Sequence, residues 1–209
     1  MTFGLVKHNN NSISAITSAG QLAQGKMTLI KEQTASSSSS ISFVDGSSSV
    51  VLDNTYPIYV FKYINIHPAT DSVYFNVNFS TDSGSNYNVT KTTTIFIGFH
   101  KEDNSTAVLQ YQTGDDLAQS TSDAILSVLV GNGNDESTSG ELILFNPSST
   151  TFVKHFISKS NDYERNNASS NTFASGYGNT SSAIDGVRFK FSSGNIDSGT
   201  IKLYGIKGS

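Results

Sequence analysis

Strict alternation of apolar and polar residues is the feature that most limits how this chain can fold. Residues 73–79 read VYFNVNF, in which every second residue is valine or phenylalanine. Side chains of a β-strand point alternately to opposite faces, so this segment is predicted to be a strand that buries one face. Residues 187–192 and 200–206 alternate in the same way on either side of a turn-rich gap, and they predict a closing hairpin.

The composition favours strands over helices through most of the 209 residues. Charged residues make up only 14% of the chain, and serine, threonine, asparagine and glycine supply the remaining polarity. Serine, threonine and asparagine compete for the backbone hydrogen bonds of a helix, and glycine loses more entropy there. Short strand-like segments recur between turn signals. We therefore predict an all-β fold, an antiparallel, jelly-roll-like β-sandwich of about ten strands.

Neighbouring strand segments predict two further hairpins. Residues 73–79 and 93–100 flank a long polar tip at residues 81–88. Residues 141–145 and 152–158 flank the short turn NPSST. If the final strand pairs in the middle of a sheet, it will lie beside strands from early in the chain, as in jelly-roll topologies.

The chain is predicted to form a single domain, residues 26–209, preceded by a mostly irregular docking arm, residues 1–25. The arm is polar, with at most a short helix around residues 18–24, and it either stays irregular or becomes ordered on a partner. It has no apolar signal-peptide region. The five-serine run at residues 36–40 is too short to separate domains. Residues 159–171 are predicted to be a polar loop.

Charge and composition exclude several classes of function. The net charge of −4 argues against binding to nucleic acid or to an anionic membrane, because both need a basic surface. The sequence has no run of about 18 apolar residues, so we expect no membrane insertion. Cysteine is absent, which excludes disulfides, cysteine zinc sites and thiol catalysis.

No set of residues matches a catalytic or metal-binding motif. The two histidines closest in sequence, His67 and His100, are 33 residues apart. His100 and His155 could meet across a sheet, but packing or surface roles are favoured. Ser175 precedes a glycine without the rest of the nucleophile-elbow motif. We therefore expect no enzymatic activity, no catalytic residue, no cofactor and no metal ligand.

Acidic residues occur as two adjacent pairs, Asp115–Asp116 and Asp135–Glu136. Adjacent carboxylates in one loop usually point apart, whereas a glycosidase needs two carboxylates that flank a groove. Residues 132–137 offer several oxygen ligands in a loop. Weak calcium binding there stays open beside the favoured interpretation as a plain turn.

Four tyrosines in or beside polar loops are the candidate surface-contact residues. They are Tyr87, Tyr111, Tyr163 and Tyr177. An exposed tyrosine supplies contact area at a low cost in conformational entropy, so these residues would suit a glycan or protein surface. The alternative is that they are ordinary half-buried structural residues.

Five segments, in order, carry a resemblance to a known family. They are KMTLIKEQTASSSSSISF, YPIYVFKYINIHPATD, FNVNFSTDSGSNYNVTKTTT, GELILFNPSSTTFVKHF and FKFSSGNIDSGTIKLYGIK. Together they resemble a family encoded in the genomes of marine tailed phages, from about residue 26 to residue 207. NIHPATD, LFNPSSTTFVKHF and SGNIDSGTIKLYG are the most distinctive parts. Members are known as uncharacterised or virion structural proteins.

The resemblance implies a structural, non-catalytic protein on the surface of the virion, associated with a tail fibre or another appendage that contacts the host. Its partners would be other virion proteins, further copies of itself in a homo-oligomer such as a trimer, and a host-surface glycan or protein. It would be located in the virion, which is assembled in the host cytoplasm. Loops at residues 81–90, 101–124 and 159–171 would face outward. A capsid decoration or cement protein and a soluble carbohydrate-binding module are the alternatives.

Overall fold

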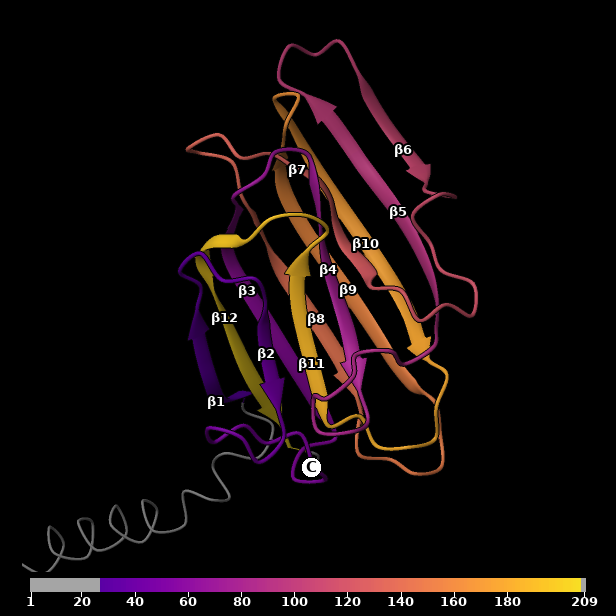
Figure 1. Cartoon of the computed structure of the whole chain (residues 1–209). Helices are drawn as coiled ribbons and strands as arrows, with labels where there is room; N and C mark the ends of the chain where they lie inside the picture. Colours follow the sequence, from indigo (N-terminus) through magenta and orange to yellow (C-terminus); the bar gives the residue numbers. More distant parts are fainter. Residues whose placement is uncertain (1–26, 208–209) are drawn as a thin grey trace, which may run out of the picture.

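A computed structural model describes residues 27–207, which form twelve β-strands and no helix (Figure 1). The strands are β1 (Met27–Thr34), β2 (Ile41–Val44), β3 (Ile58–Pro68), β4 (Val73–Ser80), β5 (Lys91–Lys101), β6 (Ala107–Tyr111), β7 (Ala124–Val130), β8 (Thr138–Phe145), β9 (Lys154–Glu164), β10 (Ala168–Gly178), β11 (Gly186–Phe191) and β12 (Ile196–Ile206). The all-β prediction is confirmed, and the strand count exceeds the predicted ten. The predicted arm and its short helix at residues 18–24 lie outside the described residues.

All paired strands are antiparallel and belong to one hydrogen-bonded sheet. The order is β1-β12-β3-β8-β9-β7-β4-β11-β2, and β10, β5 and β6 continue outward from β9. β7 and β9 share a single residue pair, Val130 with Glu164. The sheet curls at this junction into a nearly closed, barrel-like shape, in which the section β7-β4-β11-β2 faces the remaining strands (Figure 1). The predicted jelly-roll sandwich is not confirmed.

The last two strands each lie between two early strands. β12 pairs with β1 and β3, and β11 pairs with β2 and β4. The expectation that the final strand would lie beside early strands is therefore confirmed. The predicted closing hairpin is wrong, because the short connection between β11 and β12 crosses from one section of the sheet to the other.

Of the two internal hairpins, one is confirmed and one is wrong. β8 and β9 pair directly, with Leu144 opposite Phe156. β4 instead pairs with β7 and β11, while β5 pairs with β10 and β6. Residues 81–90 are long enough to carry the chain between sections, so β4 and β5 follow each other in sequence without pairing.

The predicted polar loop at residues 159–171 is also wrong. β9 and β10 run through it and leave only a three-residue turn. Within residues 159–171 their inward positions are occupied mostly by small or acidic polar side chains, including Ser160, Asp162 and Ser170, all at most 2% exposed. The alternation is present, but the buried side is polar, so it gives no apolar signal.

Aromatic rings fill the main core between the two sections of the sheet. Phe61 on β3 packs at 5.4 Å from both Phe43 on β2 and Phe189 on β11. Phe79 on β4 packs against Phe156 on β9 at the same centroid distance. Edge and tilted contacts of this kind add to the free energy gained by burying the rings.

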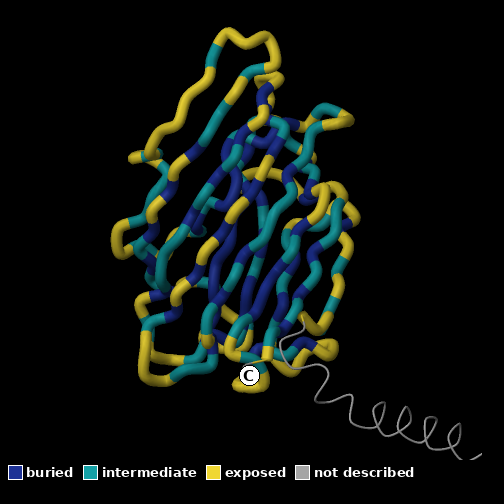
Figure 2. The backbone as a smooth tube through the Cα atoms, turned by 180° about the vertical axis from the view of Figure 1, so that it is seen from behind, coloured by how far each residue is buried: buried dark blue, intermediate teal, exposed yellow. Residues whose placement is uncertain are grey.

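A second, smaller apolar cluster lies beyond the main core. Ile95, Ile97, Val128 and Ala174 are buried, and Tyr74, Phe99, Ile125 and Leu129 pack against them while partly exposed. The nearby β5–β6 hairpin projects past the body of the molecule, and all five residues of β6 are exposed (Figure 2). A groove lies between this hairpin and the body of the molecule.

Candidate functional site

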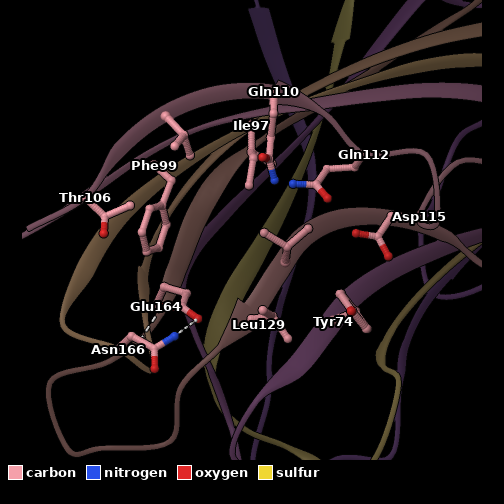
Figure 3. Close-up of a pocket in the computed structure, with 12 residues that line it drawn as sticks. Tyr74, Ile97, Phe99, Thr106, Gln110, Gln112, Asp115, Leu129, Glu164 and Asn166 are labelled. Atoms are coloured by element: carbon pink, nitrogen blue, oxygen red, sulfur yellow. Dashed lines mark hydrogen bonds between the residues drawn. The ribbon is translucent and has the colours of Figure 1, made fainter.

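An open groove of about 440 Å³ lies between the β5–β6 hairpin and β7 (Figure 3). Its lining residues come from five strands, β4, β5, β6, β7 and β9, and from the segments on either side of β6 and after β9. They are Tyr74, Ile97, Phe99, Thr106, Val108, Gln110, Gln112, Asp115, Val128, Leu129, Glu164 and Asn166. The groove therefore gathers residues that are up to 92 positions apart, from Tyr74 to Asn166.

Strand register explains the wall formed by the hairpin. Ile97 pairs with Gln110, and Phe99 pairs with Val108, so these four side chains point to the same face of β5 and β6. That face looks toward β7, whose Val128 and Leu129 form the opposite side. The groove consequently has apolar surface on both sides and amide groups near its mouth.

Leu129 contributes to the apolar lining in a strained backbone conformation. It lies inside β7 with φ at 48°, a left-handed value that is rare for a bulky residue outside a turn. Its carbonyl oxygen accepts a hydrogen bond from the Arg165 backbone N–H at 3.4 Å. Such strain tends to be retained at functional sites, where a side chain must be held in one place.

Glu164 supplies a carboxylate that is fixed at one end of the groove. The residue is only 2% exposed. Its Oε2 accepts a hydrogen bond from the Asn166 backbone N–H, and its Oε1 accepts one from the Asn166 side chain, both at 2.9 Å. The Arg165 guanidinium lies 3.4 Å from Oε1. These donors hold the carboxylate rigidly and reduce its freedom to exchange partners.

Asp115 lies at the other end of the same groove, separated from Glu164 by Leu129 and Tyr74 in the close-up (Figure 3). Burial raises the pKa of Asp115, and the neighbouring Asp116 raises it further. Asp116 itself accepts a hydrogen bond from the Tyr111 hydroxyl at 2.5 Å. The adjacent carboxylates therefore have different surroundings.

The four candidate contact tyrosines do not form one surface. Tyr163 pairs with Ser169 and Tyr177 pairs with His155, at opposite ends of the β9–β10 hairpin. The eight steps along β10 from Ser169 to Tyr177 span about 26 Å at roughly 3.3 Å per residue.

Tyr87 and Tyr111 have different environments. Tyr87 is half-buried beneath the Arg188 guanidinium, 4.5 Å from its ring centroid. Tyr111 is 47% exposed and is linked to the groove segment through Asp116. The role of all four tyrosines in surface contact stays a prediction.

The other residues considered from the sequence are dispersed. His100 pairs with Ser169 and His155 with Tyr177, so the two histidines lie far apart along β10. Within residues 27–207, no three histidine, cysteine or acidic side chains are grouped to hold a metal ion.

The loop at residues 132–137 is held together by its own side chain. Glu136 folds back to accept a hydrogen bond from the Gly133 backbone N–H, which makes the loop a closed turn.

Ser175 shares a hydrogen bond with Thr94 at 2.8 Å on the exposed face of the sheet. The part of the chain that the structure describes contains no helix long and apolar enough to span a membrane.

Sequence reasoning missed most of the groove. Glu164 and Asn166 lie in what was predicted to be a loop, and no prediction singled out Leu129. The signal that could have found Glu164 is the period-two series Ser158, Ser160, Asp162 and Glu164. Nothing in the sequence indicates that this series lines the same groove as Asp115.

Comparisons with known proteins supply no function. No family model and no curated protein matches the chain. A crystal structure of a Bacteroides ovatus protein of unknown function is similar over 50% of this chain and 45% of that chain, at 9% identity and a TM-score of 0.28. This chain therefore spans less than half of that protein, and a likeness at this level carries no argument. The resemblance to a phage family stays a prediction.

Proposed function

We propose that the protein is a structural, non-catalytic component of the surface of a tailed-phage virion and that its groove contacts the host surface. The observation that carries the contact role is the groove itself, which combines apolar walls, amide side chains and an acidic residue at each end of one open site. The resemblance to marine phage proteins supports the location. The virion would acquire the protein during assembly in the host cytoplasm.

The chemistry of the groove suits a glycan better than a protein surface. Gln110, Gln112 and Asn166 each offer an amide that can donate and accept hydrogen bonds, which matches the hydroxyl groups of a sugar. Tyr74 and Phe99 offer partly exposed aromatic surface against which the apolar face of a sugar ring can pack. Asp115, which is partly exposed at one end of the groove, accepts hydrogen bonds from hydroxyl groups or attracts a cationic amino sugar.

The position of the groove suits a particle protein. β1, where the described chain begins, and β6, beside the groove, are the two ends of the large section of the sheet (Figure 1). An arm at residues 1–25 would dock the protein to other virion proteins, while the groove faces outward. We also propose that the two facing sections of the sheet represent a β-sandwich related to jelly rolls and that the protein assembles as a homo-oligomer.

Two alternatives differ in measurable ways. A capsid decoration protein would be present in hundreds of copies per particle, compared with a few to tens for a tail appendage. A soluble carbohydrate-binding module would bind its glycan as a monomer and would be absent from particles. The groove fits this module as well, because a glycan site does not require a particle.

The proposed function is tested by competition with phage adsorption. Purified protein should bind host cells and reduce adsorption of intact phage in a dose-dependent way, because both use the same surface. Serum albumin at the same concentration is the control. Protein that neither binds host cells nor reduces adsorption would contradict the contact role, and copy counting on purified particles would then decide for or against decoration.

A further inference from the structure

β6 is an unprotected edge of the sheet. Among the described strands, three end the sheet paths: β1, β2 and β6. Edges usually avoid pairing with other chains by being short, bulged or charged. β1 has a register shift between Leu29 and Lys31 and carries Glu32, and β2 has only four residues. β6 is a regular five-residue strand, AVLQY, with no charge, proline or bulge.

Register identifies which backbone groups of β6 are free. The Gln112 N–H donates to the Ile95 carbonyl, and the Lys101 N–H donates to the Thr106 carbonyl, each at 3.0 Å. Antiparallel pairing alternates, so the even-numbered residues of this segment point their backbone groups toward β5. The N–H and C=O groups of Ala107, Leu109 and Tyr111 therefore point away from the sheet.

We propose that β6 pairs with β6 of a second copy of this chain, antiparallel and around a two-fold axis at Leu109. In this register Leu109 faces Leu109 of the second copy, and Ala107 faces Tyr111 of the second copy. Each facing pair exchanges two backbone hydrogen bonds. The outward-pointing backbone N–H and C=O groups of residues 107, 109 and 111 in both strands are then all hydrogen-bonded. The edge is therefore complementary to itself.

The side chains on the outer face favour the same contact. Leu109 is 77% exposed, although leucine gains free energy from burial. Tyr111 lies beside Phe96 in the register, and Phe96 stacks on Phe173 with centroids 5.0 Å apart. A second β6 would cover Leu109 and extend this apolar row across the two-fold axis. No charged side chain of β6 opposes one from the other copy.

The contact also affects the groove. Val108 and Gln110 belong to β6 and line the groove on its inner face. A paired β6 would extend that wall into the second copy, so the two grooves would open on the same side of a continuous sheet. The inference is independent of the virion assignment, because it rests on the edge alone.

The contact is small, so we expect an equilibrium rather than a permanent dimer. A stable interface usually involves about 20–30 residues on each side, and β6 supplies five. In sedimentation velocity, the full chain of 22.4 kDa should move toward twice that mass as its concentration rises. Hydrogen exchange should slow at the amides of Leu109 and Tyr111 over the same range.

Leu109→Pro is the sharpest variant. It removes an N–H that points away from β5, so the β5–β6 pairing is kept while the second copy is blocked. Leu109→Lys is a second variant that keeps the N–H and adds a charge. Leu29→Lys, at an exposed position on the bulged β1 edge, is the matched control.

We expect both Leu109 variants to stay monomeric with native circular dichroism and the Leu29 control to dimerise like the wild type. A wild type that stays monomeric at every concentration would overturn the proposal. So would a dimer or trimer in which the Leu109 and Tyr111 amides exchange as fast as in the monomer, or Leu109 variants that associate unchanged.

Discussion

At the scale of single residues, the groove and the sheet make opposing demands on Leu129. The sheet would favour an extended backbone there, yet the residue has a positive φ and keeps its side chain in the groove lining. A left-handed conformation costs roughly 1–2 kcal/mol for a residue with a Cβ atom. The fold tolerates this cost, which agrees with a side chain selected for contact rather than for stability.

The strain at Leu129 should reverse the usual order of stability of alanine and glycine variants inside a strand. We expect Leu129→Gly to unfold at higher denaturant concentration than Leu129→Ala, by about 1 kcal/mol in free energy, because glycine adopts positive φ without penalty. At Val128, the preceding buried position, alanine should be the more stable of the two. Equilibrium urea unfolding measures both pairs. An alanine variant more stable than glycine at residue 129 would show that the backbone is unstrained.

A second residue-scale feature is Asp162, a carboxyl group inside the sheet. It is 2% exposed, and neither of its carboxyl oxygens has a hydrogen-bond partner among the described residues. Thr138 and Ser170 lie opposite it on the neighbouring strands. Burial, and after it the charge of Glu164, raises the pKa of Asp162 to about 8. The native protein therefore holds this proton at neutral pH.

The proton on Asp162 makes stability depend on pH. Between pH 3.8 and about 8 the unfolded chain releases a proton that the native protein keeps, so the free energy of unfolding should fall as pH rises. The effect should amount to a few kcal/mol, on the order of 1.4 kcal/mol for each pH unit of the window before relaxation of the site. Urea unfolding at a series of pH values measures it.

Asp162→Asn should remove this fall in the free energy of unfolding between pH 3.8 and about 8. Asp135→Asn, at an exposed loop position, should keep it. Above pH 8 a slope of opposite sign should appear. Burial lowers the pKa of Lys91 to about 8, so the native protein loses that proton while the unfolded chain keeps it up to pH 10.5. An unchanged slope in Asp162→Asn would exclude a buried protonated carboxyl group.

At the scale of elements, the sequence predicts strands where large apolar residues alternate and fails where small polar residues do. β4 and the β8–β9 pairing follow from their own residues. β9 and β10 were mistaken in part for a loop because Ser160, Asp162 and Ser170 occupy the buried positions. Pairing between β12 and β3 is non-local, and no local pattern specifies it. The groove was missed for the same reason, since Asp115 and Glu164 come to line one groove only after β5 and β7 are in place.

The position of β12 between β1 and β3 predicts a large effect of its core residues. Leu203 is fully buried, so Leu203→Ala should lower the free energy of unfolding by about 2–5 kcal/mol through lost burial and a residual cavity. Leu29→Ala, at a half-exposed position on the neighbouring β1, should change it by less than about 1 kcal/mol. Equal losses in urea unfolding would contradict the placement of β12 inside the sheet.

At the scale of the whole molecule, a packed body lies apart from the end that we propose for recognition. Edge-packed and tilted aromatic rings hold the two sections of the sheet together. The β5–β6 hairpin projects beyond them and carries both the groove wall and the free edge (Figure 1). Binding at this end needs no rearrangement of the core, which suits a rigid protein on a particle surface.

Binding of the protein to glycan extracted from the host surface tests the central claim most directly. The double variant Gln110→Ala with Gln112→Ala removes two amides from the groove, and Asn54→Ala, in an exposed loop, is the matched control. In titration calorimetry we expect the wild type and the control to bind alike, the double variant to bind at least tenfold more weakly, and no reducing ends to be released. Equal binding by the double variant would contradict the groove as the contact site, and release of reducing ends would contradict a non-catalytic protein.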